Sequence, residues 1–201
     1  MFSKHRIEAL SDGVFAIAMT LLILDLKVPV DIAPGQLGAA LRAHGHEWIS
    51  FVITFALTSV FWTFQHRVFE VLERIDRENL TLTFVFLGFV SVLPFTTSLW
   101  GHHIKEPLAF ELYFLNEFAL ASVLTAKIEV ARFKGHLKLG TEANSLRRRL
   151  YSMCAVMATG TAAATFLPLD RVWIPVSVLA VVMNVLRKVR ERRLKRLAAV
   201  V

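Results

Sequence analysis

A chain of 201 residues that is 55% hydrophobic, contains sixteen Phe and has a mean hydropathy of +0.54 is too apolar for an ordinary soluble domain. The composition favours a multi-pass membrane protein. The single cysteine, Cys154, excludes an intrachain disulfide and argues against a cysteine-based metal site. The net charge of +7 is compatible with a nucleic-acid partner, but the distribution of the basic residues indicates membrane topology instead.

Six apolar segments approach the length of about 20 residues that a bilayer requires. They cover residues 7–28, 47–69, 78–99, 107–129, 149–167 and 172–188. The first is expected to be a retained helix, because no charged n-region and small-residue cleavage site precede it. We therefore predict an all-α integral membrane protein with six transmembrane helices in one domain over residues 1–201, ending in a basic tail over 187–201.

Basic residues are distributed unevenly between the two sides of these spans. Of the 23 Lys and Arg residues, one side holds only Lys27, Arg42, Lys105 and Arg171, and the other side holds the rest. Because Lys and Arg concentrate in cytoplasmic segments, both termini are expected in the cytoplasm and the protein in the cell (plasma) membrane. The basic runs then anchor the topology at the lipid bilayer, and neither a nucleic acid nor a soluble partner is indicated.

Two connections stand out between the spans. Residues 29–46 are rich in Pro and Gly and are expected to form an extracellular turn or a short surface helix. Residues 130–148 are polar and basic and are expected to connect the fourth and fifth helices on the cytoplasmic side.

The first span begins with ionisable residues. Asp12 directly precedes the apolar run, and a carboxylate at bilayer depth costs roughly 2.5–3.5 kcal/mol, so it is a functional candidate. On a helical wheel of about 100° per residue, an aliphatic stripe lies on the side away from Asp12. The stripe consists of Gly13, Ile17, Thr20, Leu21 and Leu24. Its spacing is also that of an ordinary packing seam. Asp12 is expected to point back into the helices of its own subunit, where it must be paired.

The start of this helix resembles a known signature. Arg6 followed by Ser11-Asp12 is similar to the Arg-x-x-x-Phe-Ser-Asp sequence in the first helix of the endolysosomal potassium channel family called transmembrane protein 175. Leu10 stands where the family has Phe, which changes the local packing and leaves the Ser-Asp pair intact.

The resemblance continues into the next two spans. Trp62 and His66 match a Trp-x-x-x-His pattern in the second helix of the family. The third span has Asn79 near its start and Pro94-Phe95 near its far end, like the third helix of the family. The resemblance implies a network that fixes the first helix against its neighbours. Its members would be Arg6, Ser11, Asp12, Trp62, His66 and Asn79.

The resemblance also implies a function. In this family the first helices of four identical subunits line a central pore, and a ring five residues after the signature Asp forms the narrowest constriction. That position is Ile17 here, and the further pore positions fall on Thr20, Leu21 and Leu24. The implied protein is a homotetrameric cation channel that prefers K⁺ over Na⁺ and uses no cofactor beyond the permeant ion. Four copies of Asp25 would concentrate cations at the outer mouth.

Two other function classes stay open. A proton-coupled secondary transporter would also place Asp12 and His66 inside a bundle, although the first span lacks a helix break before Pro29. A non-transporting membrane scaffold or a membrane enzyme predicts no ion flux. No phosphate loop or nucleophile–base spacing supports an enzyme. The His102-His103-x-x-Glu106 sequence is expected to be solvated, so we predict no metal site.

Overall fold

The computed structural model describes residues 3–27, 30, 33–138 and 141–166, and every regular element in these ranges is helical. The elements in chain order are α1 (Lys4–Leu21), the 3₁₀ helix η1 (Leu22–Asp25), α2 (Leu37–Ala43), α3 (Gly45–Val71), α4 (Arg77–His102), α5 (Pro107–Phe133) and α6 (Thr141–Phe166). The predicted sixth span, 172–188, and the basic tail, 187–201, lie outside the described residues.

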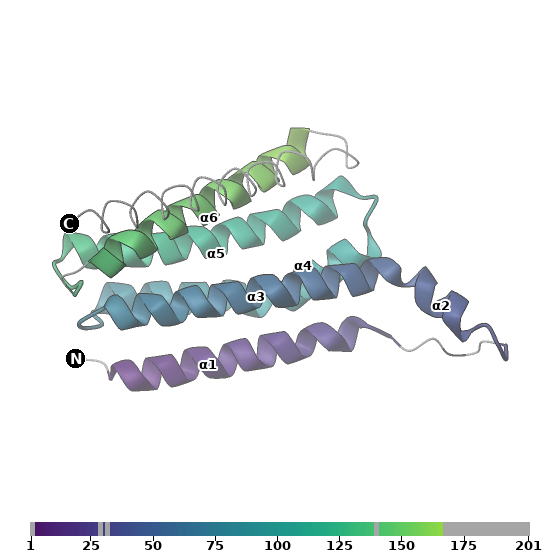
Figure 1. Cartoon of the computed structure of the whole chain (residues 1–201), viewed down its shortest axis with the longest axis horizontal. Coiled ribbons are helices and arrows are strands. Elements are labelled where there is room, and N and C mark those ends of the chain that lie inside the picture. Colours follow the sequence, from purple (N-terminus) through teal and green to yellow (C-terminus); the bar gives the residue numbers. More distant parts are fainter. Residues whose placement is uncertain (1–2, 28–29, 31–32, 139–140, 167–201) are drawn as a thin grey trace, which may run out of the picture.

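The five long helices run side by side along the longest dimension of the molecule (Figure 1). α1 packs against α3 and α4, and α5 packs against both α4 and α6. The short helix α2 projects beyond one end of the bundle and corresponds to the short surface helix expected between the first two spans. The core between the long helices is apolar and aromatic, as in the pair Phe15 and Phe86, whose ring centroids are 5.8 Å apart.

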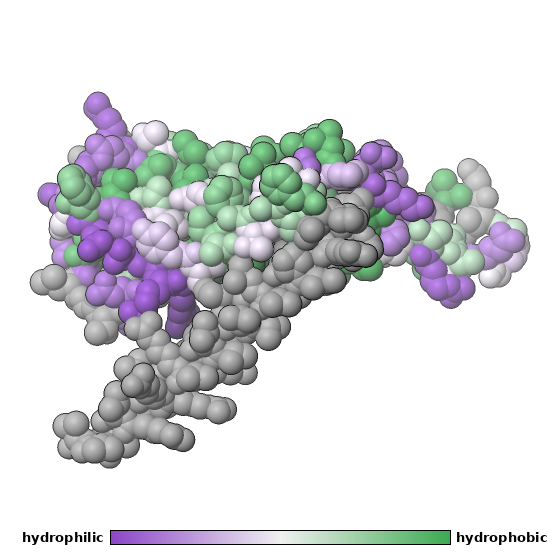
Figure 2. Space-filling view, turned by 90° about the horizontal axis from the view of Figure 1, so that it is seen from above, coloured by the Kyte–Doolittle hydropathy of each residue, from purple (hydrophilic) through white to green (hydrophobic). Residues whose placement is uncertain are grey.

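Four of the described helices are long and apolar enough to cross a membrane. They are Lys4–Asp25, Gly45–Val71, Arg77–His102 and Pro107–Phe133, and they match the first four predicted spans within a few residues at each end. One face of the molecule carries apolar side chains along its middle and polar side chains toward its ends (Figure 2). This pattern is what a bilayer selects, because the hydrocarbon core is bounded by water on both sides. The chain is therefore a multi-pass membrane protein.

The fifth predicted span begins earlier than the sequence indicates. α6 starts at Thr141, inside the segment predicted to be a connector, and continues to Phe166. Ala143, Leu146 and Leu150 recur at helical spacing and are buried, so this polar stretch is an amphipathic helix that packs on α5. Arg147 donates from Nε to the Glu129 carboxylate over 2.5 Å, which joins α6 to α5 at this end.

The two loops that follow α3 and α5 are tied together at the same end of the bundle. Leu72 and Leu137 form an isolated antiparallel bridge, and Gly135 adopts a φ of 67° just after the end of α5. Asp76 caps α4 by accepting from the backbone N–H of Asn79 over 2.9 Å, and it also pairs with Lys134 at 2.7 Å. The register between the α3–α4 and α5–α6 helix pairs is therefore fixed by backbone and charge contacts.

Candidate functional site

The first helix has one buried face and one exposed face. Its buried residues are Ile7, Ser11, Phe15 and Ala18, followed by Leu22 in η1. The predicted stripe lies on the other side, where Ile17 is 61% exposed, Leu21 43% and Leu24 71%. Gly13 and Thr20 are exposed as well. Three large aliphatic side chains of the first span therefore face outward from the helical bundle.

Thr20 is the polar member of this stripe. Its hydroxyl hydrogen is directed at the helix backbone, with Ala16 O at 3.0 Å and Ile17 O at 2.8 Å. A threonine hydroxyl carries one donor and two acceptor lone pairs. The oxygen of this exposed residue therefore keeps acceptor capacity for a further polar contact.

Asp12 lies at the edge between α1 and α3, and the expectation that it points into the interior of the subunit is wrong. Its carboxylate is exposed and accepts a hydrogen bond from Trp62 Nε1 over 2.9 Å. On the helical wheel Asp12 lies about 100° from the centre of the buried face of α1, so it borders α3 rather than entering the core. Tryptophan commonly packs its apolar ring against a neighbour while its indole N–H donates a hydrogen bond.

His66 reaches Asp12 only through Trp62. The two rings are stacked, with centroids 5.8 Å apart and planes 16° from parallel, and His66 Nε2 lies 3.5 Å from Glu70 Oε1. The structure thus brings together a row of contacting side chains along one side of α1 and α3, namely Asp12, Trp62, His66 and Glu70. The sequence pointed to Trp62 and His66, while Glu70 follows one helical turn after His66 and was missed.

The remaining members of the predicted network do not contact this row of side chains. Ser11 and Asn79 are buried, at 2% and 0% exposure, and among the described residues their side-chain polar atoms have no hydrogen-bond partner. Arg6 is exposed, and in the described part of the chain no hydrogen bond or ion pair joins it to Asp12. The predicted network is therefore divided. Asp12, Trp62 and His66 lie in one exposed row, Ser11 and Asn79 are buried separately, and Arg6 is exposed without a contact to Asp12.

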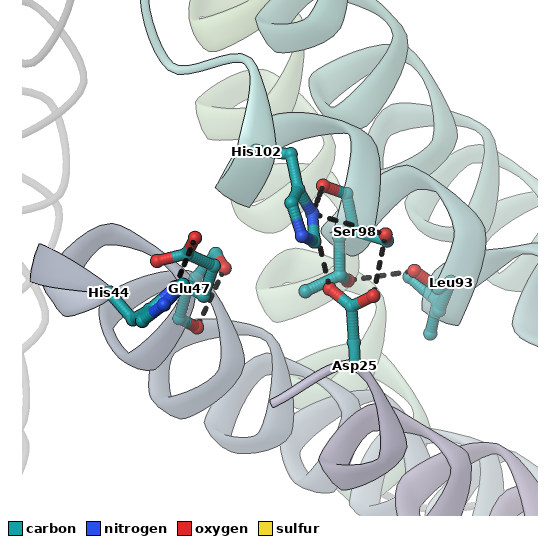
Figure 3. A network of polar contacts seen from close by, with 8 residues as sticks. Asp25, His44, Glu47, Leu93, Ser98 and His102 are labelled. Atoms are coloured by element: carbon teal, nitrogen blue, oxygen red, sulfur yellow. Dashed lines mark hydrogen bonds and ion pairs between the residues drawn. The ribbon is translucent and has the colours of Figure 1, made fainter. Parts of the chain in front are cut away.

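Asp25 ends η1 at the opposite end of the helix, within a polar cluster (Figure 3). Ser98 Oγ of α4 donates to Asp25 Oδ1 over 2.8 Å, and His102 Nδ1 lies 3.6 Å from Asp25 Oδ2. Glu47 and His44 form a second pair nearby at 3.2 Å. Asp25 therefore holds the end of the first span against α4, a role that its sequence position did not reveal.

The core of the bundle contains polar groups that the sequence analysis missed. Lys127 is fully buried, donates from Nζ to Gln65 Oε1 over 2.9 Å, and lies 4.5 Å from the centroid of the Phe69 ring. The sequence analysis counted Lys127 with the basic residues of the cytoplasmic side and did not predict that its ammonium group lies in the core. The sequence did contain a signal that Lys127 shares a face with core residues. Alternating steps of four and three residues place on one helix face Tyr113, Glu117, Leu120, Leu124 and Lys127.

Two further side chains line the same buried face of α5. Thr54 Oγ1 donates to the Tyr113 hydroxyl over 3.1 Å, and the hydroxyls of Thr54 and Thr97 are also 3.1 Å apart. Glu117 is fully buried next to Tyr113. These contacts link α3, α4 and α5 in the membrane-spanning region.

The fold therefore defines an integral membrane protein in which an apolar first helix is held at the edge of a helical bundle. Comparison with known proteins makes the assignment specific. The family described as "Endosomal/lysosomal potassium channel TMEM175" matches residues 6–94, which hold α1, α3 and most of α4. Residues 6–94 therefore carry the sequence pattern of this family of ion channels, and the expectation that the protein is not an enzyme agrees with that match.

Individual relatives support the same assignment. A potassium channel of Streptomyces collinus is 39% identical over 109 residues, covering 54% of this chain and 53% of the relative. The mouse endosomal/lysosomal proton channel TMEM175 is 34% identical over 113 residues, covering 52% of this chain and 23% of the relative. The match thus spans about half the length of the bacterial relative.

A solved structure extends the likeness to nearly the whole chain. The crystal structure of a lysosomal potassium-selective channel TMEM175 homolog from Chamaesiphon minutus superimposes with a TM-score of 0.76 at 28% identity. The superposition covers 89% of this chain and 93% of the other. The similarity in fold therefore reaches beyond the region in which the sequences carry the family signature.

Proposed function

We propose that the chain is a potassium-preferring cation channel in which α1 of each of four identical subunits lines a central pore. The single observation that carries this proposal is the exposed apolar stripe of α1, opposite the face that packs on α3 and α4. The names of the bacterial relatives support potassium as the permeant ion. A second copy of the chain, rather than lipid alone, would then cover this stripe.

Ile17 is proposed as the narrowest point of the pore. A ring of four aliphatic side chains gates by excluding water, so a cation must lose part of its hydration shell to pass. K⁺ gives up water at a lower free-energy cost than Na⁺, which provides selectivity without a carbonyl filter. Leu21 and Leu24 would extend the apolar lining, and the outward oxygen of Thr20 would coordinate a partly dehydrated ion.

The pair of Asp12 and Trp62 is proposed to set the position of α1. Their hydrogen bond of 2.9 Å crosses from α1 to α3 at the edge of the exposed stripe. A rotation of α1 that moved Ile17 away from the pore would break this bond. His66 stacks on Trp62 and would keep the indole in place, while Ser11 and Asn79 would act in packing rather than in the ion path.

A second candidate function is proton conduction. It is favoured by the vertebrate relatives, which are named proton channels and match about half of this chain at up to 35% identity. A proton-coupled transporter, the other reading of Asp12 and His66, would require a coupled substrate. Both alternatives predict acidification or alkalinisation of a vesicle lumen without accompanying potassium flux.

Both termini are proposed to face the cytoplasm, with the channel in the plasma membrane. The Lys- and Arg-rich ends of α3, α5 and α6 lie at one end of the bundle, together with the start of α1 (Figure 1). Cytoplasmic loops carry the excess of basic residues in membrane proteins.

The test is ion flux into proteoliposomes that contain the purified protein, with equal gradients of K⁺ and Na⁺ compared. We expect K⁺ flux to exceed Na⁺ flux and Ile17→Asn to change both, because a polar ring hydrates the constriction. Ile49→Asn is the matched control, since Ile49 is a 52% exposed isoleucine on α3. Proton flux without K⁺ flux would favour the second candidate, and no flux of either kind would favour a scaffold.

A further inference from the structure

Two adjacent cavities lie between α3 and α6, at the end of the bundle where the basic residues concentrate. The first has a volume of about 370 Å³ and is lined mostly by charged and polar side chains. The second has a volume of about 290 Å³ and runs along α3. Arg67 of α3 and Arg149 of α6 line both cavities, so these two residues lie where the cavities adjoin.

Neither of these arginines is neutralised by an acidic side chain in the described residues. Arg147, two positions before Arg149, binds Glu129, whereas no ion pair of Arg67 or Arg149 is formed in the described part of the chain. Glu70 and Glu142 line only the first cavity, and Glu70 Oε1 lies 3.5 Å from His66 Nε2 rather than against an arginine. Two neighbouring guanidinium groups form a strong and specific site for a phosphate, which they bind through parallel hydrogen bonds.

The second cavity is apolar in its chemistry. Val60 and Phe64 line it together with Ser59 and Thr63. The two hydroxyls donate to backbone carbonyls of their own helix, over 2.8 Å to Phe55 O and 2.9 Å to Ser59 O, so their hydrogens are not available to a ligand. Val60 lies seven residues before Arg67, which is about 10 Å along the helix toward the middle of the membrane.

We propose that these cavities bind an anionic phospholipid, with its phosphate between Arg67 and Arg149 and one acyl chain along α3 beside Val60. The charge of the junction selects a phosphate, and the apolar cavity that continues from it toward hydrocarbon depth selects a lipid over a soluble anion. Basic pockets between transmembrane helices on the cytoplasmic side bind anionic headgroups in this way. The site lies at the end that we propose faces the cytoplasm.

The test is native mass spectrometry of the purified full chain with added phosphatidylglycerol or phosphatidylcholine of the same acyl chains. We expect phosphatidylglycerol to bind more tightly, and Arg67→Gln or Arg149→Gln to weaken it about fivefold, because one arginine near a membrane surface contributes about 1 kcal/mol. Arg148→Gln is the matched control, since Arg148 is exposed, belongs to the same basic triplet and lines neither cavity.

A second variant separates a lipid from a soluble anion. Val60→Trp fills the apolar cavity without removing a charge, and we expect it to reduce phosphatidylglycerol binding while binding of inorganic phosphate stays the same. Equal binding of the two lipids, or an equal effect of Arg148→Gln, would overturn the site. So would a Val60→Trp protein that binds phosphatidylglycerol normally. Lipid binding is measured without ion flux, so this proposal and the channel proposal fail separately.

Discussion

The helices α1 and α5 divide the apolar and polar residues of this protein in opposite ways. The first span is the more apolar of the two, yet only 28% of its most apolar stretch is buried, whereas in α5 the buried share is 56%. The first span directs Ile17 of α1 and Leu24 of η1 outward, and α5 directs Glu117 and Lys127 into the core. A soluble protein would show the reverse arrangement.

The difference shows which helix is a support and which is a contact surface. Polar groups buried in the core link neighbouring helices, as Lys127 of α5 does with Gln65 of α3, and the fold loses stability if one partner is removed. An outward apolar stripe adds nothing to the fold of a single subunit, but it provides a surface for lipid or for another subunit. Variants that affect one property without the other will test this division.

The largest expected effect separates the two faces of α1. Phe15 is 1% exposed and Ile17 is 61% exposed. Phe15→Ala should lower the free energy of unfolding by about 3–5 kcal/mol, because it leaves a cavity beside Phe86. Ile17→Ala should change it by no more than about 0.5 kcal/mol. Thermal unfolding in detergent measures both, and similar losses for the two variants would mean that Ile17 also packs within the subunit.

The next effect concerns the buried pair in α3 and α5. Gln65→Leu removes the acceptor of the Lys127 ammonium and should destabilise the subunit by roughly 1.5–3 kcal/mol, since a buried charge loses its hydrogen bond. Adding Lys127→Met should restore most of that stability, because the remaining side chains are apolar and of similar size. A double variant no more stable than Gln65→Leu alone would show that the pair is not coupled.

A glycine at the contact between α5 and α6 sharpens the comparison. A Cβ at Gly160 would stand 2.3 Å from the Phe114 ring, whereas a Cβ at Gly88 on α4 meets nothing within 4 Å. Gly160→Ala should cost about 1–3 kcal/mol through overpacking. Gly88→Ala should stabilise by up to about 1 kcal/mol, because alanine favours the helix. Unfolding midpoints of the two proteins should therefore move in opposite directions.

The smallest effect is a pH dependence at the loop contact. Although partial burial acts to raise it, hydrogen bonds from Lys134 and Asn79 hold the pKa of Asp76 down at about 2. The folded state therefore favours the ionised form of Asp76. The stability that the Asp76 carboxylate contributes is present above the unfolded pKa of about 3.8 and is lost as the pH falls toward 2.

Asp76→Asn tests this contact, because asparagine keeps the helix cap and removes the charge. The variant should be less stable than the wild type by about 1 kcal/mol at pH 7, after allowance for solvent screening. The gap should close as the pH is lowered from 4 toward 2. A gap that is constant with pH would contradict the assignment.

The parts of the fold that a local pattern specifies were predictable from the sequence. The first four spans follow from their length and apolarity, and the helical period places the stripe of the first span on one face, although spacing alone did not decide whether that face is exposed. The partner of Asp12 was not predictable. Trp62 and His66 are four residues apart and share one face of α3, so spacing does not decide which of them reaches the carboxylate. In the structure the Trp62 indole reaches the Asp12 carboxylate, and the His66 ring stacks on the indole.

The buried polar core was missed for a different reason. A lysine close to the end of an apolar span is assigned to the interface when only its position along the chain is considered. Lys127 reaches the core because it lies on the buried face of α5, where Gln65 accepts its hydrogen bond. The early start of α6 was missed because Arg147 and its neighbours mask the buried positions Leu146 and Leu150 between them.

The most direct test of the channel proposal is a thiol placed at Ile17. Cys154 is the only cysteine of the chain, so Cys154→Ser gives a cysteine-free background for Ile17→Cys and for the control Ala18→Cys on the buried face. A charged, membrane-impermeant thiol reagent should block K⁺ flux through the Ile17→Cys protein and leave the control and background proteins unaffected. An Ile17→Cys channel that conducts K⁺ and is neither labelled nor blocked would contradict a pore lined by α1.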